Sequence, residues 1–146
     1  MKNVKLKIIS LSGRMPFYAT DQSAGFDIAA YLPDGEVIIS AGERMLVPTG
    51  YFVEIPEGYE AQIRARSGLA IKHGIGLVNG IGTVDADYRG EWLVPLINWS
   101  KDDFIIKDGE RIAQVVIAPV CRAELELVDE IGETERGAGG FGHTGR

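Results

Sequence analysis

The chain has 146 residues, of which 45% are hydrophobic, and it carries a formal net charge of −6. This length suffices for one domain with a substantial core, and the acidic balance argues against a general nucleic-acid binder, which is usually basic. Cys121 is the only cysteine, so an intramolecular disulfide is excluded and a reducing compartment is favoured.

Neither a secretion signal nor a membrane span is expected. The first seven residues, MKNVKLK, lack an apolar segment, and no apolar run approaches the roughly 20 residues that cross a bilayer. We therefore expect a cytoplasmic protein without a membrane or nucleic-acid partner. Two histidines and one cysteine are also too few for a zinc site made of protein ligands alone.

Alternation of apolar and polar residues predicts an all-β chain. Val4, Leu6 and Ile8 alternate with lysines, and residues 59–66 alternate in the same way, which is the period of half-buried strands. Turn signals rich in Pro, Gly and Asp separate these segments. Many short strands of this kind indicate a sandwich, barrel or jelly roll. Further strands are predicted over residues 37–39, 45–53, 92–97, 104–106 and 112–120.

The segment SAGFDI, residues 23–28, places Asp27 after a glycine and before an apolar stretch. The Asp27 carboxylate would either hold a metal-bound water or fix a turn. Taken alone, the segment favours the turn.

Residues 67–72 form the one predicted helix, with Ser67 as its cap and Gly74 at its end. Backbone N–H groups at a helix start bind anions, and Arg66 would add a charge-assisted phosphate contact. In isolation, an ordinary capped turn with an exposed arginine explains the segment better.

Residues 79–91, NGIGTVDADYRGE, are the most informative stretch of the chain. Gly80 and Gly82 predict a tight reversal in a hairpin that brings Asn79 close to Asp85. An amide, a carboxylate and the Tyr88 ring would then line a small pocket suited to a flat polar ring and an activated water. The alternative for this segment alone is an acidic surface hairpin.

Gln114 stands among apolar neighbours in residues 109–116, GERIAQVV. A partly buried amide needs hydrogen-bond partners. Gln114 would bind either a ligand or a neighbouring backbone, and the structural role is the better interpretation in isolation.

The last residues, 133–146, are rich in glycine and polar side chains, so we expect a flexible lid after a folded domain over residues 1–132. Arg136 would reach a terminal phosphate and Phe141 would stack on a base, although a plain disordered tail fits equally well. The spacing of Gly137, Gly139 and Gly142 matches a dinucleotide fingerprint, but no βαβ unit surrounds it.

Taken together, five motifs resemble those of the trimeric dUTPase family, in family order and with family-like spacing. His143 is a small departure, because many members have serine there. The motifs are AGFD at 24–27, RSGLA at 66–70, NGIGTVDADYRGE at 79–91, GERIAQ at 109–114 and RGAGGFGHTG at 136–145.

The resemblance implies a jelly-roll subunit in a homotrimer with shared active sites, and hydrolysis of dUTP to dUMP and diphosphate. That reaction keeps uracil out of DNA and supplies dUMP for dTMP synthesis. Asp85 is implied to activate the water that attacks the α-phosphate, and Asp27 to contact the water shell of a Mg²⁺ held mainly by the triphosphate. The implied phosphate-binding residues are Arg66, Ser67, Gly68, Gln114 and Arg136, and the implied uracil and deoxyribose residues are Asn79, Gly82, Thr83, Val84, Tyr88, Phe141 and Gly142.

Other functions remain open at this point. A dCTP deaminase, including the bifunctional kind, is similar in fold but carries a catalytic glutamate ten residues after the aspartate, where this chain has Pro95. A non-catalytic trimeric nucleotide-binding protein would be expected to lack Asp85 or the tail. A jelly-roll structural protein would not need these polar clusters.

Overall fold

The computed structural model describes residues 3–142 and 145, and within them the chain forms eleven strands and one short helix. The expected all-β class with a single short helix is confirmed. The strands are β1 (Lys7–Ser10), β2 (Phe17–Tyr18), β3 (Phe26–Ala29), β4 (Glu36–Ile39), β5 (Arg44–Glu54), β6 (Tyr59–Arg64), β7 (Ile75–Leu77), β8 (Ile81–Val84), β9 (Glu91–Asn98), β10 (Phe104–Lys107) and β11 (Arg111–Pro119), and the helix is α1 (Ser67–His73).

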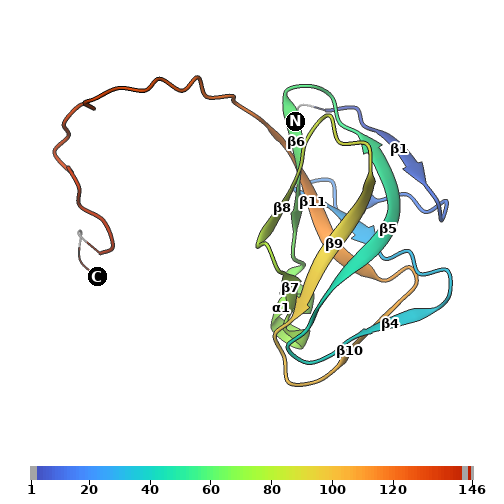
Figure 1. Cartoon of the computed structure of the whole chain (residues 1–146). Coiled ribbons are helices and arrows are strands. Elements are labelled where there is room, and N and C mark those ends of the chain that lie inside the picture. The colour runs from blue at the N-terminus through green and yellow to red at the C-terminus, as the bar shows by residue number, and fades with distance from the viewer. Residues whose placement is uncertain (1–2, 143–144, 146) are drawn as a thin grey trace.

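Two antiparallel sheets make up most of the molecule. One has the strand order β1-β5-β9-β7 and the other has the order β2-β3-β11-β6-β8. A separate antiparallel ribbon pairs β4 with β10 and projects at the lower right of Figure 1. Strands distant in the sequence therefore pair with one another: β11 lies between β3 and β6.

The core lies between the inner faces of the two larger sheets. Along β9, Trp92, Val94 and Leu96 are buried while the intervening positions are less so, as expected where one face of a strand packs inward. Ile28 of β3 and Val115 of β11 belong to the same buried cluster. Burial of each such aliphatic side chain stabilises the fold by roughly 1.5–3 kcal/mol.

Helix α1 begins without a side-chain cap. Arg66 occupies the N-cap position in an extended conformation, so the prediction that Ser67 caps the helix was wrong, and Ser67 is its first residue. Gly74 ends the helix in the left-handed conformation, as predicted, and its N–H donates to the Ala70 carbonyl. None of the helical residues is buried.

The predicted strands are confirmed, with shifts at their ends. β1 begins at Lys7, so Val4 and Leu6 precede it, and β6 stops at Arg64 rather than Arg66. The short strands β2, β3, β7 and β8 were not predicted.

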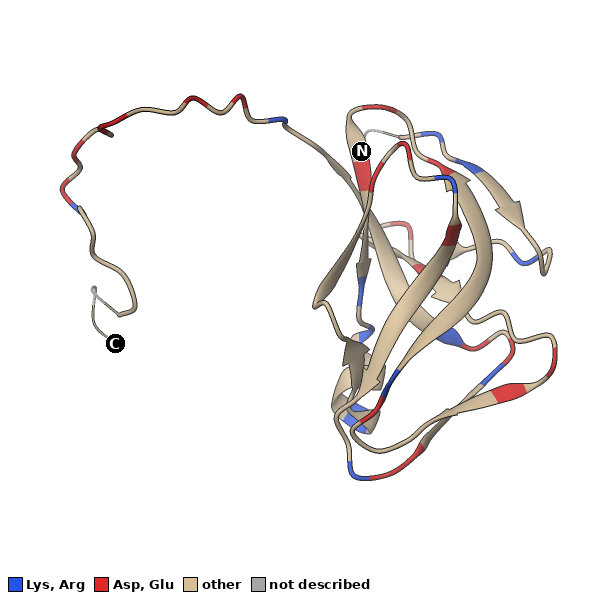
Figure 2. Ribbon diagram, in the orientation of Figure 1, with Lys and Arg blue, Asp and Glu red and all other residues tan. Residues whose placement is uncertain are grey.

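The chain leaves the sheets after Pro119, where β11 ends. Residues 120–142 contain no strand or helix, are mostly exposed, and run outward as an extended arm in Figure 1. Most of the charges along this arm are acidic (Figure 2). Among the described residues, no helix has the length and apolar character needed to cross a membrane.

Candidate active site

A pocket of about 290 Å³ opens beside β8 and β9. It brings together the predicted base and sugar residues that lie in the folded part of the chain: Asn79, Gly82, Thr83, Val84, Tyr88 and, beside them, Asp85. The remaining wall is largely apolar and consists of Leu46, Ile63, Glu91, Trp92, Leu93 and Pro95.

The turn at the mouth of this pocket is not the hairpin that we predicted. Strand β7 pairs with β9 in one sheet, and β8 pairs with β6 in the other, so the turn carries the chain from sheet to sheet. Gly80 has φ of 71°, and the Ile81 N–H donates to the Asn79 carbonyl at 2.8 Å. Gly82 lies within β8 opposite Ile63. The change of sheet, rather than strand pairing, brings Asn79 to the pocket that Asp85 lines.

Asp85 follows the last residue of β8 and is exposed. Its backbone carbonyl accepts the Tyr88 N–H at 3.2 Å, which closes a turn over residues 85–88. Within the described part of the chain, the Asp85 carboxylate forms no hydrogen bond or ion pair. It is therefore available to a water molecule, as a general base must be.

A second cluster surrounds Asp27. Asp27 lies within β3, paired with Gln114 of β11, so its segment is a strand and not the turn that we favoured. Arg66 donates from Nε to Asp27 Oδ1 at 3.2 Å, and Arg111 donates from Nη1 to Asp27 Oδ2 at 3.0 Å. The Asp27 side chain is only 15% exposed, so the two arginines compensate a largely buried charge.

Gln114 joins this cluster through the backbone. Its Nε2 donates to the Ala65 carbonyl at 3.0 Å, which ties β11 to the segment between β6 and α1. Ser67 and Gly68 are exposed directly beyond that segment. The structural role that we expected for the Gln114 amide is therefore present. Its hydrogen bond fixes Ala65, which directly precedes the predicted phosphate-binding residues Arg66, Ser67 and Gly68.

The two groups of residues lie on either side of β6 but do not share a pocket. Gly82 of β8 pairs with Ile63, and Gln114 of β11 pairs with Arg64. The wall of the 290 Å³ pocket includes none of Asp27, Arg66 and Gln114. Within one chain, the predicted base pocket and the predicted phosphate cluster are therefore separate.

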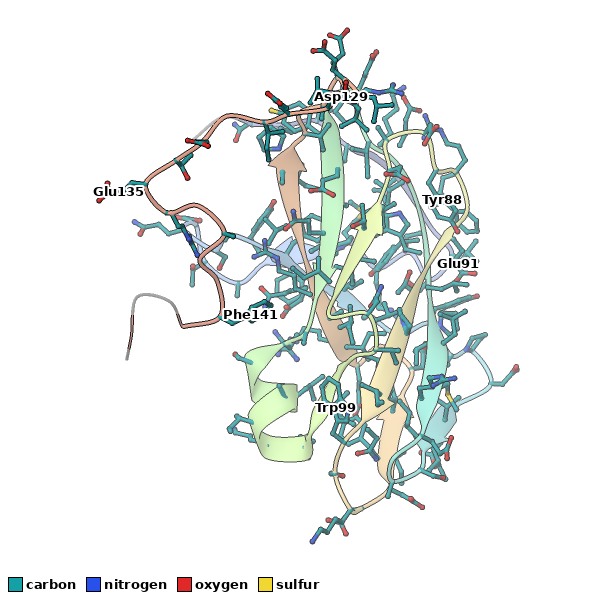
Figure 3. All side chains as sticks on the ribbon, turned by 60° about the vertical axis from the view of Figure 1, so that its left-hand side comes forward. Tyr88, Glu91, Trp99, Asp129, Glu135 and Phe141 are labelled. Atoms are coloured by element: carbon teal, nitrogen blue, oxygen red, sulfur yellow. The ribbon has the colours of Figure 1, made fainter. Side chains whose placement is uncertain are left out.

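The tail residues lie apart from both groups. Phe141 is fully exposed on the arm, with φ of 41°, and in Figure 3 it lies on the opposite side of the view from Tyr88 and Glu91. Arg136 donates from Nε to the Gly139 carbonyl at 2.9 Å, and Gly142 is exposed. His143 and the rest of the predicted lid at residues 144 and 146 lie outside the described residues.

Residues of β9 that were not predicted also line the pocket. Glu91 is the last residue of the polar motif, Trp92 follows it directly, and Leu93 and Pro95 lie further along β9. Strand periodicity alone does not show which neighbour an outward-facing residue will contact. The indole Nε1 of Trp92 is buried without a hydrogen-bond partner in the described part of the structure.

Within residues 3–142 and 145, no group of three or more His, Cys, Asp or Glu side chains could hold a metal ion. Both oxygens of Asp27 are already engaged by arginines. The donors present therefore do not fit a cation bound by protein ligands alone, and an ion held by another group would meet an Asp27 carboxylate that is already shared with two arginines.

Two packed antiparallel sheets with one short helix define an all-β protein, and a pocket with polar and apolar walls lies on one side of β6 with an arginine cluster on the other. The family model for dUTPase matches residues 12–145. The chain belongs to the dUTPase family.

Individual relatives agree with this assignment. The deoxyuridine 5'-triphosphate nucleotidohydrolase of Syntrophotalea carbinolica is 52% identical over 147 residues, which cover 99% of both chains. The dUTPase of Staphylococcus bacteriophage 80alpha, solved as a mutant with dUpNHpp, is 28% identical with a TM-score of 0.85 and full coverage of both chains. A mutant dUTPase from phage phi11 of S. aureus, described with a structural Mg(II) ion, is 25% identical with a TM-score of 0.76 over 86% of this chain and 97% of its own.

Proposed function

We propose that this chain hydrolyses dUTP to dUMP and diphosphate, which keeps uracil out of DNA and supplies dUMP for dTMP synthesis. The observation that carries the proposal is the 52% identity to a nucleotidohydrolase over the whole chain. The pocket agrees with it, because Asn79, Asp85 and Tyr88 share one wall there.

Asp85 is the proposed general base. Its carboxylate is free of other partners in the described structure and lies at the end of β8, on a turn closed by the Tyr88 N–H. In the proposed reaction it accepts a proton from a water that attacks the α-phosphorus, and diphosphate leaves. Because a carboxylate is a weak base in free water, its contribution depends on holding that water in line with the phosphorus.

The free edge of β8 supports selection of a base. β8 is the last strand of its sheet, and β6 occupies only one of its sides. Along residues 82–84 the backbone N–H and C=O groups of alternate residues point away from β6, and these are not used by a described neighbouring strand. Together with the Asn79 amide, they offer donors and acceptors that would pair with uracil and be left unpaired by cytosine, which is costly for buried groups.

Arg66, Ser67, Gly68 and Gln114 are the proposed phosphate-binding residues. Arg66 offers charge-assisted hydrogen bonds to phosphate oxygens, and the exposed backbone of Ser67 and Gly68 lies next to it. Mg²⁺ bound to the triphosphate would further neutralise the charge on these oxygens. The proposed contact of Asp27 with this ion is indirect, since its oxygens hold Arg66 and Arg111.

A homotrimer with shared sites is the proposed assembly. The base pocket and the phosphate cluster are separate within one chain, and Phe141 touches neither of them in the described structure. Phe141 and Gly142 would reach the base on another chain. Residues 124–135 carry six carboxylates, and Arg136 is the first cation after them, so Arg136 is the residue of this arm suited to a terminal phosphate.

The structure offers nothing in favour of a dCTP deaminase. Pro95 lies on β9 and lines the pocket, where that branch of the fold would need a proton-transferring glutamate. Proline has no side-chain group that can donate or accept a proton.

Parallel assays on dUTP, dCTP, dTTP and UTP test the proposal, with diphosphate and ammonia release followed in the same samples. We expect diphosphate release from dUTP alone and no ammonia. Ammonia from dCTP would favour the deaminase, and nucleotide binding without hydrolysis would favour a non-catalytic binder.

A further inference from the structure

The Tyr88 ring is folded back over its own loop. The Tyr88 hydroxyl donates to the Glu91 carbonyl at 3.0 Å, and Figure 3 shows these two residues on the same flank of the molecule. Tyr88 as a whole residue is 44% exposed, and it lines the pocket. Its position is thus set at two points, the Cα of Tyr88 and the hydroxyl at the far end.

Gly90 lies directly under this ring. A Cβ added at Gly90 would lie 2.3 Å from the Tyr88 hydroxyl oxygen, 2.5 Å from Cζ and 2.9 Å from Cε2. All three distances are shorter than real Cβ contacts, so any side chain at position 90 would displace the ring. Gly90 does not have a left-handed backbone, so the need for glycine arises from the ring and not from φ.

Hydrogen bonds hold the backbone in place on both sides of Gly90. Arg89 donates from Nη1 to the Ala86 carbonyl at 2.7 Å and to the Tyr88 carbonyl at 3.1 Å. Glu91 accepts the Gly50 N–H on Oε1 at 2.8 Å, which anchors the loop to β5. A collision at position 90 would therefore be relieved by movement of the Tyr88 side chain.

We infer that Gly90 is a positioning residue for sugar selection: it leaves the space in which the Tyr88 ring is held flat against the loop by its hydrogen bond to Glu91. The inference rests on the proposed function. With the ring fixed in this way, the floor of the deoxyribose site is rigid and leaves no room for a 2′-hydroxyl. Glycine at position 90 thus determines specificity without touching the nucleotide.

The test compares kcat/KM for dUTP and for UTP in the unaltered chain, Gly90→Ala, Tyr88→Ala and the double variant, with a thermal melt of each. We expect Gly90→Ala to lower the dUTP-to-UTP ratio by roughly tenfold or more, since displacement of a positioned group by about 1 Å can cost up to about 10²-fold. In the Tyr88→Ala background the same change should alter neither the ratio nor the melting temperature, because the ring it collides with is gone. Gly132→Ala is the matched control, because no atom lies within 4 Å of a Cβ there and its φ is ordinary.

An unchanged dUTP-to-UTP ratio in an active Gly90→Ala variant would overturn this inference alone. Equal losses in the two backgrounds would overturn it as well, because the effect would then not pass through the ring. Should Gly90→Ala fail to fold, a double variant that folds like Tyr88→Ala supports the collision, and one that also fails contradicts it. Lack of dUTP hydrolysis by the unaltered chain would instead remove the proposed function itself, and this inference with it.

Discussion

Asp27 and Asp85 differ in whether their carboxylates have hydrogen-bond partners. Asp27 is largely buried and engaged by Arg66 and Arg111, whereas Asp85 is exposed and has no side-chain partner in the described structure. Both Asp27 oxygens already accept a hydrogen bond from a guanidinium group. This difference supports the proposal that Asp85, and not Asp27, activates the water.

Replacement of Asp85 by asparagine tests this assignment. Asparagine preserves size but cannot take a proton, so we expect turnover of dUTP to fall by roughly 10²-fold or more. Binding of a non-hydrolysable dUTP analogue and the melting temperature should change little, because Asp85 is exposed and supports no other side chain. Steady-state kinetics and calorimetric titration measure the two effects separately.

Asp87→Asn is the appropriate control for that substitution. Asp87 is an exposed aspartate two residues further along the same turn and is absent from the pocket wall. It should retain near-normal turnover. Similar losses in the two variants would mean that general loss of negative charge, and not proton transfer at Asp85, is responsible.

At the scale of elements, a polar brace formed by Arg14, Leu32 and Asp108 joins the segment after β1 to the turn after β10. Arg14 donates to Asp108 from both terminal nitrogens, at 2.9 and 2.8 Å, and the Leu32 N–H donates to Asp108 Oδ1. The Arg14 hydrogen bond, followed by that of Leu32, holds the pKa of the Asp108 carboxyl below its ordinary value of 3.8.

This brace predicts a pH-dependent contribution to stability. A carboxyl whose pKa is lower in the folded than in the unfolded state stabilises the fold above its unfolded pKa, and the contribution is lost as the pH falls through the folded value. Asp108→Asn should therefore lower the melting temperature at pH 7, and its difference from the unaltered chain should close below about pH 4.

Thermal melts across that pH range measure the difference directly. Asp34→Asn, at an exposed turn position, removes the same formal charge and should leave the melting temperature nearly unchanged at each pH. A gap for Asp108→Asn that stays constant down to pH 2.5 would show that proton binding at this carboxyl is not coupled to folding.

Sequence patterns predicted the long strands well and the short ones poorly. β9 and β11 have eight and nine residues, and their long apolar runs were enough to predict a strand. β3 and β7 have four and three residues, and the sequence pattern did not single them out, although β1 and β4, each as short as β3, were predicted. At residues 79–82 the glycines correctly indicated a reversal, but local sequence does not record that the chain changes sheets there.

The sequence also predicted which site residues meet only where those residues are close together along the chain. Asn79, Asp85 and Tyr88 lie within ten residues of one another, and the motif itself predicted their meeting. The contact of Arg66 with Asp27 spans 39 residues and depends on β11 lying between β3 and β6. Topology of that kind is a property of the whole sheet, so only the family resemblance pointed to a common site.

The whole molecule exposes apolar groups that one chain alone does not cover. Leu125, Leu127 and Ile131 on the arm are 91%, 100% and 88% exposed. Large exposed apolar side chains in a row mark surfaces that associate. We expect light scattering to give about three times the 15.9 kDa chain mass. A fully active monomer at micromolar concentration would contradict the proposal of shared sites.

Removal of residues 136–146 tests the lid. The described residues of this segment, 136–142 and 145, contribute nothing to the buried core, so we expect the melting temperature and the assembly to be nearly unchanged. Hydrolysis of dUTP should fall strongly, because base stacking of the kind proposed for Phe141 is worth on the order of 1–3 kcal/mol and the Arg136 contact is lost with it. Phe141→Ala alone should have the smaller effect.

Kinetics and melts of the truncated chain decide between three roles. Full activity would leave the segment without a function in the reaction. Loss of the folded state would assign it a structural role. Only loss of activity in a stable, assembled protein agrees with the lid.

The position of β11 also dictates when this protein can fold during its synthesis. β11 is the last strand to be made, yet it fills the middle of its sheet between β3 and β6. Until residues 111–119 leave the ribosome, those two strands present unpaired edges, and such edges are prone to association with other chains. At about 5–20 residues per second, the exposed interval lasts for seconds. Chains released early at residue 110 should therefore aggregate, whereas chains released at residue 135 should fold.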